Sequence, residues 1–148
     1  MGAWNVLSQR EDDHLSLLPS ELQHLDIGIA ALSEVQRPDC DEIMAGGYTY
    51  YWSGHDDGYH TKAVAVSVSD KLTPMIIEVT PVNERIMSQR ICHSLGVISL
   101  VSVHALTEAS DLTVKDAFSA TLKSVIGQCP QVRYSSYVWG FQCFDWNL

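Results

Sequence analysis

Apolar and polar positions follow one another along this chain in runs that predict both strands and helices, and one run is central. Residues Ile27–Val35 are mostly apolar and lie between Asp26 and Arg37-Pro38. Such a run between turn-forming residues predicts a strand that is buried on both faces. Glu34 is its one carboxylate, at the end where open α/β sheets place their ligands. Glu34 is therefore a candidate ligand-binding residue, and a rim ion pair with Arg37 is the alternative.

The residues before this strand predict another strand and a helix. Ala3–Leu7 is a short apolar segment that contains the polar residue Asn5, and it predicts the first strand. Glu11-Asp12-Asp13 suits the N-terminus of a helix. Leucines then follow at spacings of three and four, at Leu15, Leu18, Leu22 and Leu25. This spacing predicts an amphipathic helix, which Pro19 should kink or restart.

The rest of the chain predicts further strands and a second helix. Pro38–Gly47 is expected to be a turn-rich connection. The expected strands are Tyr48–Trp52, Ala63–Ser69, Pro74–Val79, Arg85–His93 and Leu95–His104. After N-cap candidates at Ala109-Ser110-Asp111, apolar residues at helical spacing predict a helix that ends near Gly127. The sequence shows no repeat and no linker, so we predict one domain.

Composition and charge limit the functions that are open to the chain. It has 148 residues, 46% hydrophobic and 18% charged, which suits one globular domain. The net charge of −9 argues against non-specific binding to nucleic-acid phosphates. The 4 cysteines have no CxxC spacing, so neither a zinc site nor a disulfide framework is predicted. Without a signal peptide or a membrane-spanning run, we expect an intracellular protein, nuclear or cytoplasmic.

The polar segment His55–His60 offers two histidines and two aspartates. These residue types can bind a metal ion. The same segment contains Asp57-Gly58, which is typical of a tight turn between two strands. The tip of a hairpin is the favoured interpretation, and a metal cluster is the alternative.

Several short segments match the pattern of one protein family. They are Trp4-Asn5-Val6, Leu25-Asp26-Ile27, Ala31–Val35, the aromatic segment Gly46–Gly54, Glu84-Arg85-Ile86-Met87 and Val101-Ser102-Val103. Through them, residues 3–130 resemble the endonuclease/exonuclease/phosphatase superfamily. The similarity is greatest to the endonuclease domain of LINE-type retrotransposons and to the craniofacial development protein 2-like proteins derived from them.

The resemblance implies an α/β sandwich of two mixed sheets with helices outside, and phosphodiester cleavage that requires Mg²⁺ or Mn²⁺. In this chemistry a metal held by a carboxylate polarises the phosphate, and a His-Asp pair activates water. By resemblance, Glu34 is the metal-binding carboxylate, and Asn5 helps to orient the metal and the phosphate. A capping or turn role is the alternative for Asn5.

The sequence departs from the family pattern after Val101-Ser102-Val103. The family has Tyr-Ala-Pro-Thr there, with a tyrosine that faces the phosphate, whereas this chain has His104-Ala105-Leu106-Thr107. His104 can still donate a hydrogen bond to a phosphate, so we assign it to the catalytic residues with Asn5. A decayed site is the alternative. The family's Gly-Asp-Phe-Asn-Ala motif and its Ser-Asp-His segment, which supplies the catalytic histidine, do not occur in the sequence.

Residues 131–148 do not match the family, and their six aromatic residues fit neither a helical nor a strand period. When this segment is written as degenerate codons and translated from the second base, it permits an apolar strand followed by Gly-Asp-Phe-Asn-Ala. We therefore hypothesise a one-base frameshift near Pro130. The coding DNA tests the hypothesis directly, because codons that spell the motif in no frame would exclude it.

The sequence thus predicts an incomplete endonuclease/exonuclease/phosphatase-type α/β sandwich, with the N-terminal half of the domain in residues 1–130 and a non-matching tail in 131–148. We expect an uncovered sheet face and an unpaired edge, through which the chain self-associates or binds a protein. The predicted function is that of an inactive relative of a Mg²⁺-dependent endonuclease acting on nucleic acid. An active endonuclease and a domesticated protein-interaction module are the alternatives.

Overall fold

Two mixed β-sheets form the centre of the protein. The computed structural model describes residues 1–5, 12–35, 37–55, 63–94, 96–129 and 138–143. The first sheet has the order β1-β2-β5-β4-β3, with bounds Gly2–Asn5, Ile29–Ser33, Ala63–Ser69, Tyr48–Gly54 and Cys40–Ala45. The second has the order β6-β7-β8-β9, with bounds Ile76–Asn83, Ile86–His93, Gly96–His104 and Val138–Cys143. β1 is parallel to β2 and β9 is parallel to β8, while the other neighbours are antiparallel.

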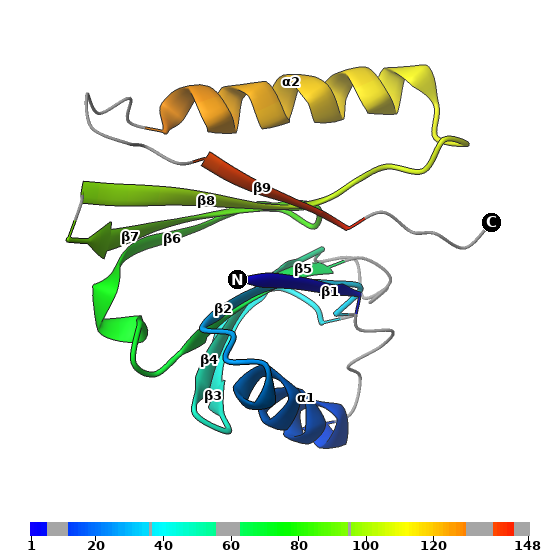
Figure 1. Cartoon of the computed structure of the whole chain (residues 1–148). Coiled ribbons are helices and arrows are strands. Elements are labelled where there is room, and N and C mark those ends of the chain that lie inside the picture. The colour runs from blue at the N-terminus through cyan, green and yellow to red at the C-terminus, as the bar shows by residue number, and fades with distance from the viewer. Residues whose placement is uncertain (6–11, 36, 56–62, 95, 130–137, 144–148) are drawn as a thin grey trace.

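The helices lie outside the two sheets. α1, Asp12–His24, covers the outer face of the first sheet, and α2, Leu112–Gln128, covers the outer face of the second (Figure 1). A single 3-10 turn, Thr73–Met75, leads from the first sheet into the second. The predicted sandwich of two mixed sheets with helices outside is therefore the observed architecture. No helix in the described ranges is long and apolar enough to cross a membrane.

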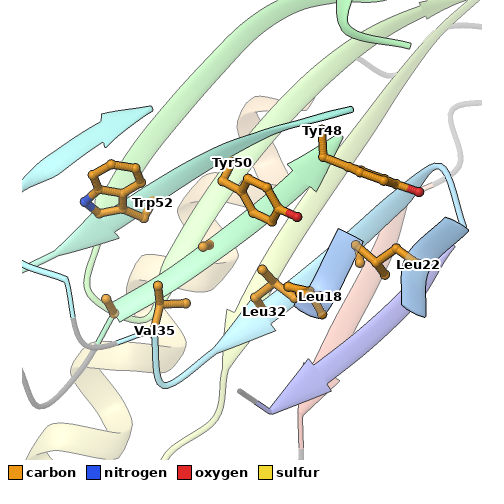
Figure 2. Close-up of a cluster of buried hydrophobic side chains, with 10 residues drawn as sticks. Leu18, Leu22, Leu32, Val35, Tyr48, Tyr50 and Trp52 are labelled. Atoms are coloured by element: carbon orange, nitrogen blue, oxygen red, sulfur yellow. The ribbon is translucent and has the colours of Figure 1, made fainter. Parts of the chain in front are cut away.

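One apolar core holds α1 against the first sheet. Figure 2 shows Leu18 and Leu22 of α1 against Leu32 of β2 and the aromatic side chains of β4. Every second residue of β4 faces this core, because successive strand residues point to opposite faces. The helix continues through Pro19 and does not restart there, so of the two expected effects the kink stays a prediction. The Pro19 ring lies against Gly46, where an added Cβ would come within 2.5 Å of it.

A second core lies between the two sheets. Ile29 of β2 and the valines of β5 pack there with Met87 and Ile91 of β7 and with Leu100 of β8. The inner faces of the sheets therefore cover each other, which corrects the expected uncovered face. A third core joins Val125 of α2 to the outer face of the second sheet. Apolar residues on both faces of β2 and β5 explain why their sequences are almost continuously apolar.

Two strands were not predicted. β3 lies in the segment that was expected to be a turn-rich connection, and β9 lies in the tail, whose aromatic residues fit no strand period. β3 is an edge strand in which no residue is fully buried, so its apolar positions give a weak signal. β9 pairs along β8 over its whole length, a long-range contact that a local pattern does not encode.

Stability at high pH should depend on Tyr50. This residue is 2% exposed, and its hydroxyl has no hydrogen-bond partner among the described residues. Burial, with a smaller effect from Tyr48, raises the pKa of Tyr50. In the unfolded chain a tyrosine has a pKa of about 10. Because the folded-state pKa of Tyr50 is higher, its contribution to stability is complete at pH values below the unfolded-state pKa and is lost as the pH rises toward the folded-state pKa. We therefore expect the free energy of unfolding to decrease above about pH 10.

The variant Tyr50→Phe should lessen this decrease and leave stability at neutral pH unchanged or higher. Tyr48→Phe is the matched variant, because the Tyr48 hydroxyl donates a hydrogen bond of 2.8 Å to the Ile27 carbonyl. It should lose about 0.5–1.5 kcal/mol at neutral pH. Urea unfolding at neutral pH and at about pH 11 separates the two effects. An equal alkaline loss in Tyr50→Phe and in the parent protein would contradict the expectation.

Candidate functional site

Glu34 follows directly on β2 in a backbone conformation that few non-glycine residues adopt. Its φ is +59°, in the left-handed region. The residues on either side are fixed, because Ser33 and Val35 are both buried and the Val35 amide donates to the Ala63 carbonyl over 3.4 Å. Glu34 itself is half-buried. Backbone strain of this kind is concentrated at functional sites, so the conformation favours a ligand-binding role for Glu34.

The loop after Glu34 is anchored to the end of β4. The Trp52 indole nitrogen donates to the Pro38 carbonyl over 3.0 Å, and the Gly54 amide donates to the Asp39 carbonyl over 2.7 Å. The Arg37 guanidinium lies over the Trp52 ring, 5.0 Å from its centroid. Gly54 has no room for a side chain, because an added Cβ would collide with the Arg37 carbonyl. The aromatic segment that carries the family resemblance thus fixes the loop beside the candidate carboxylate.

Asn5 lies at the same end of the first-sheet strands as Glu34. It is the last residue of β1 and pairs in parallel register with Ser33, the last residue of β2. The carboxyl ends of two neighbouring parallel strands lie side by side. The structure describes the backbone of Asn5 and not its side chain, so its role with metal and phosphate stays a prediction.

His104 ends β8, and Arg85 fixes the backbone at this point. The His104 amide donates to the Arg85 carbonyl over 2.8 Å, while the Arg85 guanidinium donates to the carbonyls of His104 and Ala105 over 3.3 and 3.0 Å. Burial lowers the pKa of Arg85, and Glu84 opposes this effect. Arg85 therefore supports the position where the chain departs from the family pattern. The sequence marked Arg85 only as part of a matching segment and did not assign it this role.

The three candidate residues lie at one end of the sandwich. β1, β8 and β9 run toward the same side of the molecule (Figure 1), and β2 is parallel to β1. Side chains alternate between the two faces of β8, so His104 lies on the same face as Leu100. This face packs into the core between the sheets. This end of the sandwich thus receives Asn5 and Glu34 from the first sheet and His104 from the second.

The residues at this end fit part of a magnesium site. Mg²⁺ prefers oxygen ligands and is often held by one or two carboxylates together with substrate phosphates and water. Glu34 offers one such carboxylate. Within the described ranges, no group of three or more His, Cys, Asp or Glu side chains gathers in a way that could hold a metal. The alternative metal cluster at His55–His60 lies mostly outside the described residues, which include only His55 of that segment.

Comparison with known proteins connects this architecture to one fold. No protein-family model matches the chain, and no curated protein matches it significantly. Solved structures do match. The endonuclease domain of TRAS1, a telomere-specific non-LTR retrotransposon, superimposes with a TM-score of 0.62 and 19% identity over 93% of this chain and 57% of its own. An AP endonuclease from Archaeoglobus fulgidus gives a TM-score of 0.63 and 16% identity over 93% of this chain and 55% of its own.

A third structure carries the family name. An endonuclease/exonuclease/phosphatase family protein from Leptotrichia buccalis matches with a TM-score of 0.53 and 15% identity, over 94% of this chain and 64% of its own. The protein therefore has the endonuclease/exonuclease/phosphatase fold. It spans a little over half the length of the first two of these structures.

Proposed function

We propose that this chain provides the metal-binding part of a phosphodiesterase domain that acts on nucleic acid. The observation that carries the proposal is Glu34, held in a left-handed conformation at the end of β2 and beside the end of β1. Mg²⁺ or Mn²⁺ bound there would stabilise the charge that develops on the leaving oxygen. Asn5 would orient the phosphate, and His104 would donate a hydrogen bond to one of its oxygens. Two of the similar structures are named as endonucleases, which supports this substrate class.

We further propose that these 148 residues do not cleave nucleic acid by themselves. Hydrolysis requires a group that removes a proton from the attacking water. By resemblance, that group belongs to the Ser-Asp-His segment and is supported by the Gly-Asp-Phe-Asn motif, neither of which this sequence contains. Glu34, Asn5 and His104 would then bind and orient a phosphate without activating water.

The position of β9 supports the frameshift hypothesis. The shifted frame would place Asp-Phe-Asn at the codon junctions from Gly140 to Cys143. In the register of β9 on β8, these positions lie beside Val101–His104. The missing motif would then join the end of the sandwich that carries His104. Sequencing of the coding DNA from Pro130 onward decides between this arrangement and a tail that is native to the protein.

A nicking assay tests the proposed lack of cleavage. We expect no conversion of supercoiled plasmid to open circles by the chain in the presence of Mg²⁺ or Mn²⁺, beyond that seen with Glu34→Ala. The alternative is an active endonuclease in which His104 replaces the tyrosine. Metal-dependent nicking that disappears in Glu34→Ala and persists in Glu108→Ala would establish that alternative. Glu108 is a suitable control because it is exposed and lies in the turn before α2.

A further inference from the structure

An open cleft lies between the two sheets, on the side of β3 and β6. Its volume is about 400 Å³, and it is lined by β3, by Tyr51 and Trp52 of β4, by β6 and by Met87. Neither Glu34 nor His104 is among the described residues that line this cleft. It is therefore separate from the candidate metal site and needs its own explanation.

The edge of β3 borders this cleft and can accept a further strand. β3 and β6 are the last strands on this side of their sheets. β6 is a poor template, because its pairing with β7 is interrupted twice and it contains Pro81. β3 instead pairs with β4 in unbroken register from Cys40 to Ala45. An unbroken edge strand presents backbone donors and acceptors to any extended chain that approaches it.

The side chains around the cleft combine apolar surface with negative charge. Met44 is 79% exposed and Ile77 is 50% exposed. Three carboxylates line the same cleft, at Asp41, Glu42 and Glu78. Glu42 lies close enough to Tyr51 to add to the effect of burial in raising the pKa of that tyrosine. Glu78 forms an ion pair with Arg90 over 3.6 Å, and the Glu78 side chain is 54% exposed.

We propose that the β3 edge and the cleft beside it bind an extended basic segment of a partner protein, which adds to the first sheet as a further strand. Backbone hydrogen bonds to β3 would provide affinity, and side chains that alternate along the added strand would provide specificity. Successive residues of β3 point to opposite faces of the sheet, and Glu42 lies opposite Tyr51 on the cleft side. The lysines or arginines of the added strand would lie on this side, beside Glu42, and its apolar residues would lie on the other face, beside Ile43. A second copy of this chain is a poorer occupant, because two β3 edges would bring like charges together.

A pair of synthetic peptides tests this proposal. The first alternates lysine with valine, and the second alternates glutamate with valine. We expect the lysine peptide to bind the whole chain and to slow amide hydrogen exchange in Cys40–Ala45, while the glutamate peptide does neither. Glu42→Lys should weaken binding of the lysine peptide by roughly tenfold or more, because a repulsive charge replaces an attractive one. Glu108→Lys, an equal charge change at an exposed site outside the cleft, should alter it less than about twofold.

Each other outcome overturns the proposal. Equal binding of the two peptides would show apolar adhesion without charge recognition. Equal weakening by Glu42→Lys and Glu108→Lys would show attraction to the overall charge of the protein. Unchanged amide exchange in Cys40–Ala45 would show that the peptide binds elsewhere. A lysine peptide that does not bind at all would show that the β3 edge is not a docking surface for basic segments. A dimer of the parent chain that Glu42→Lys dissociates would assign the edge to a second copy. Circular dichroism of each variant confirms that it is folded.

Discussion

The variant Leu22→Ala should lower the free energy of unfolding by about 2–5 kcal/mol, the largest single effect that we expect. Leu22 is 0% exposed and lies with Leu18 in the core that holds α1 against the first sheet (Figure 2). Truncation removes apolar surface from this core and leaves a cavity, because the surrounding aromatic residues of β4 can relax only in part. Denaturant unfolding monitored by tryptophan fluorescence measures the loss.

Leu25→Ala is the matched control. Leu25 belongs to the same pattern of leucines in the sequence, but it follows the end of α1 and is 53% exposed. Its truncation should change the free energy of unfolding by less than about 0.5 kcal/mol. Similar losses in Leu22→Ala and Leu25→Ala would contradict the observed packing of α1. They would show instead that both leucines contribute through helix formation alone.

The second large effect is a gain in stability from Gln89→Leu. Gln89 is 1% exposed and lies between Met87 and Ile91 on β7, on the face that packs into the core between the sheets. Neither its amide nitrogen nor its amide oxygen has a hydrogen-bond partner among the described residues. A buried polar group without a partner costs about 1–3 kcal/mol. Leucine has a similar volume and no polar atoms, so the variant should gain stability of that order.

Gln128→Leu provides the control for this gain. Gln128 ends α2 and is exposed, so its replacement should change stability by less than about 0.5 kcal/mol. Thermal unfolding of both variants gives the comparison, with an expected rise of several degrees for Gln89→Leu only. A lower melting temperature in Gln89→Leu would contradict the account, because it would mean that the Gln89 amide is satisfied by a partner that leucine cannot replace.

The strands that the sequence predicted are those with a strong local pattern. β5 alternates valine with small residues, and both of its faces are buried, so its bounds agree with the predicted Ala63–Ser69. β3 and β9 were missed for different reasons. β3 is exposed along most of its length, and β9 depends on pairing with a strand that lies far away in the sequence. The uncovered sheet was a wrong expectation because a local pattern does not show that the inner faces of β2, β5, β7 and β8 pack together.

The candidate site was predictable in part. A carboxylate at the end of a buried apolar run is visible in the sequence, and Glu34 was proposed as a site residue in this way. Its left-handed backbone is not visible in the sequence, because glutamate, unlike Asn or Asp, is not a residue type enriched at positive φ. The support of His104 by Arg85 was missed as well, because it runs through backbone carbonyls that any residue could offer. That the ends of β1, β2 and β8 lie at one end of the sandwich can be seen only in the tertiary structure.

The most direct test of the account is the binding of Mn²⁺ to the chain, followed by paramagnetic broadening of amide resonances. We expect broadening to begin at Ser33, Glu34 and Val35 and to include His104, because the proposed metal site lies at this end of the sandwich. Glu34→Gln should abolish this pattern, whereas Glu108→Gln should preserve it. Broadening that persists unchanged in Glu34→Gln, or that centres on Asp41 and Glu42 of β3, would contradict the assignment of Glu34 as the metal-binding carboxylate.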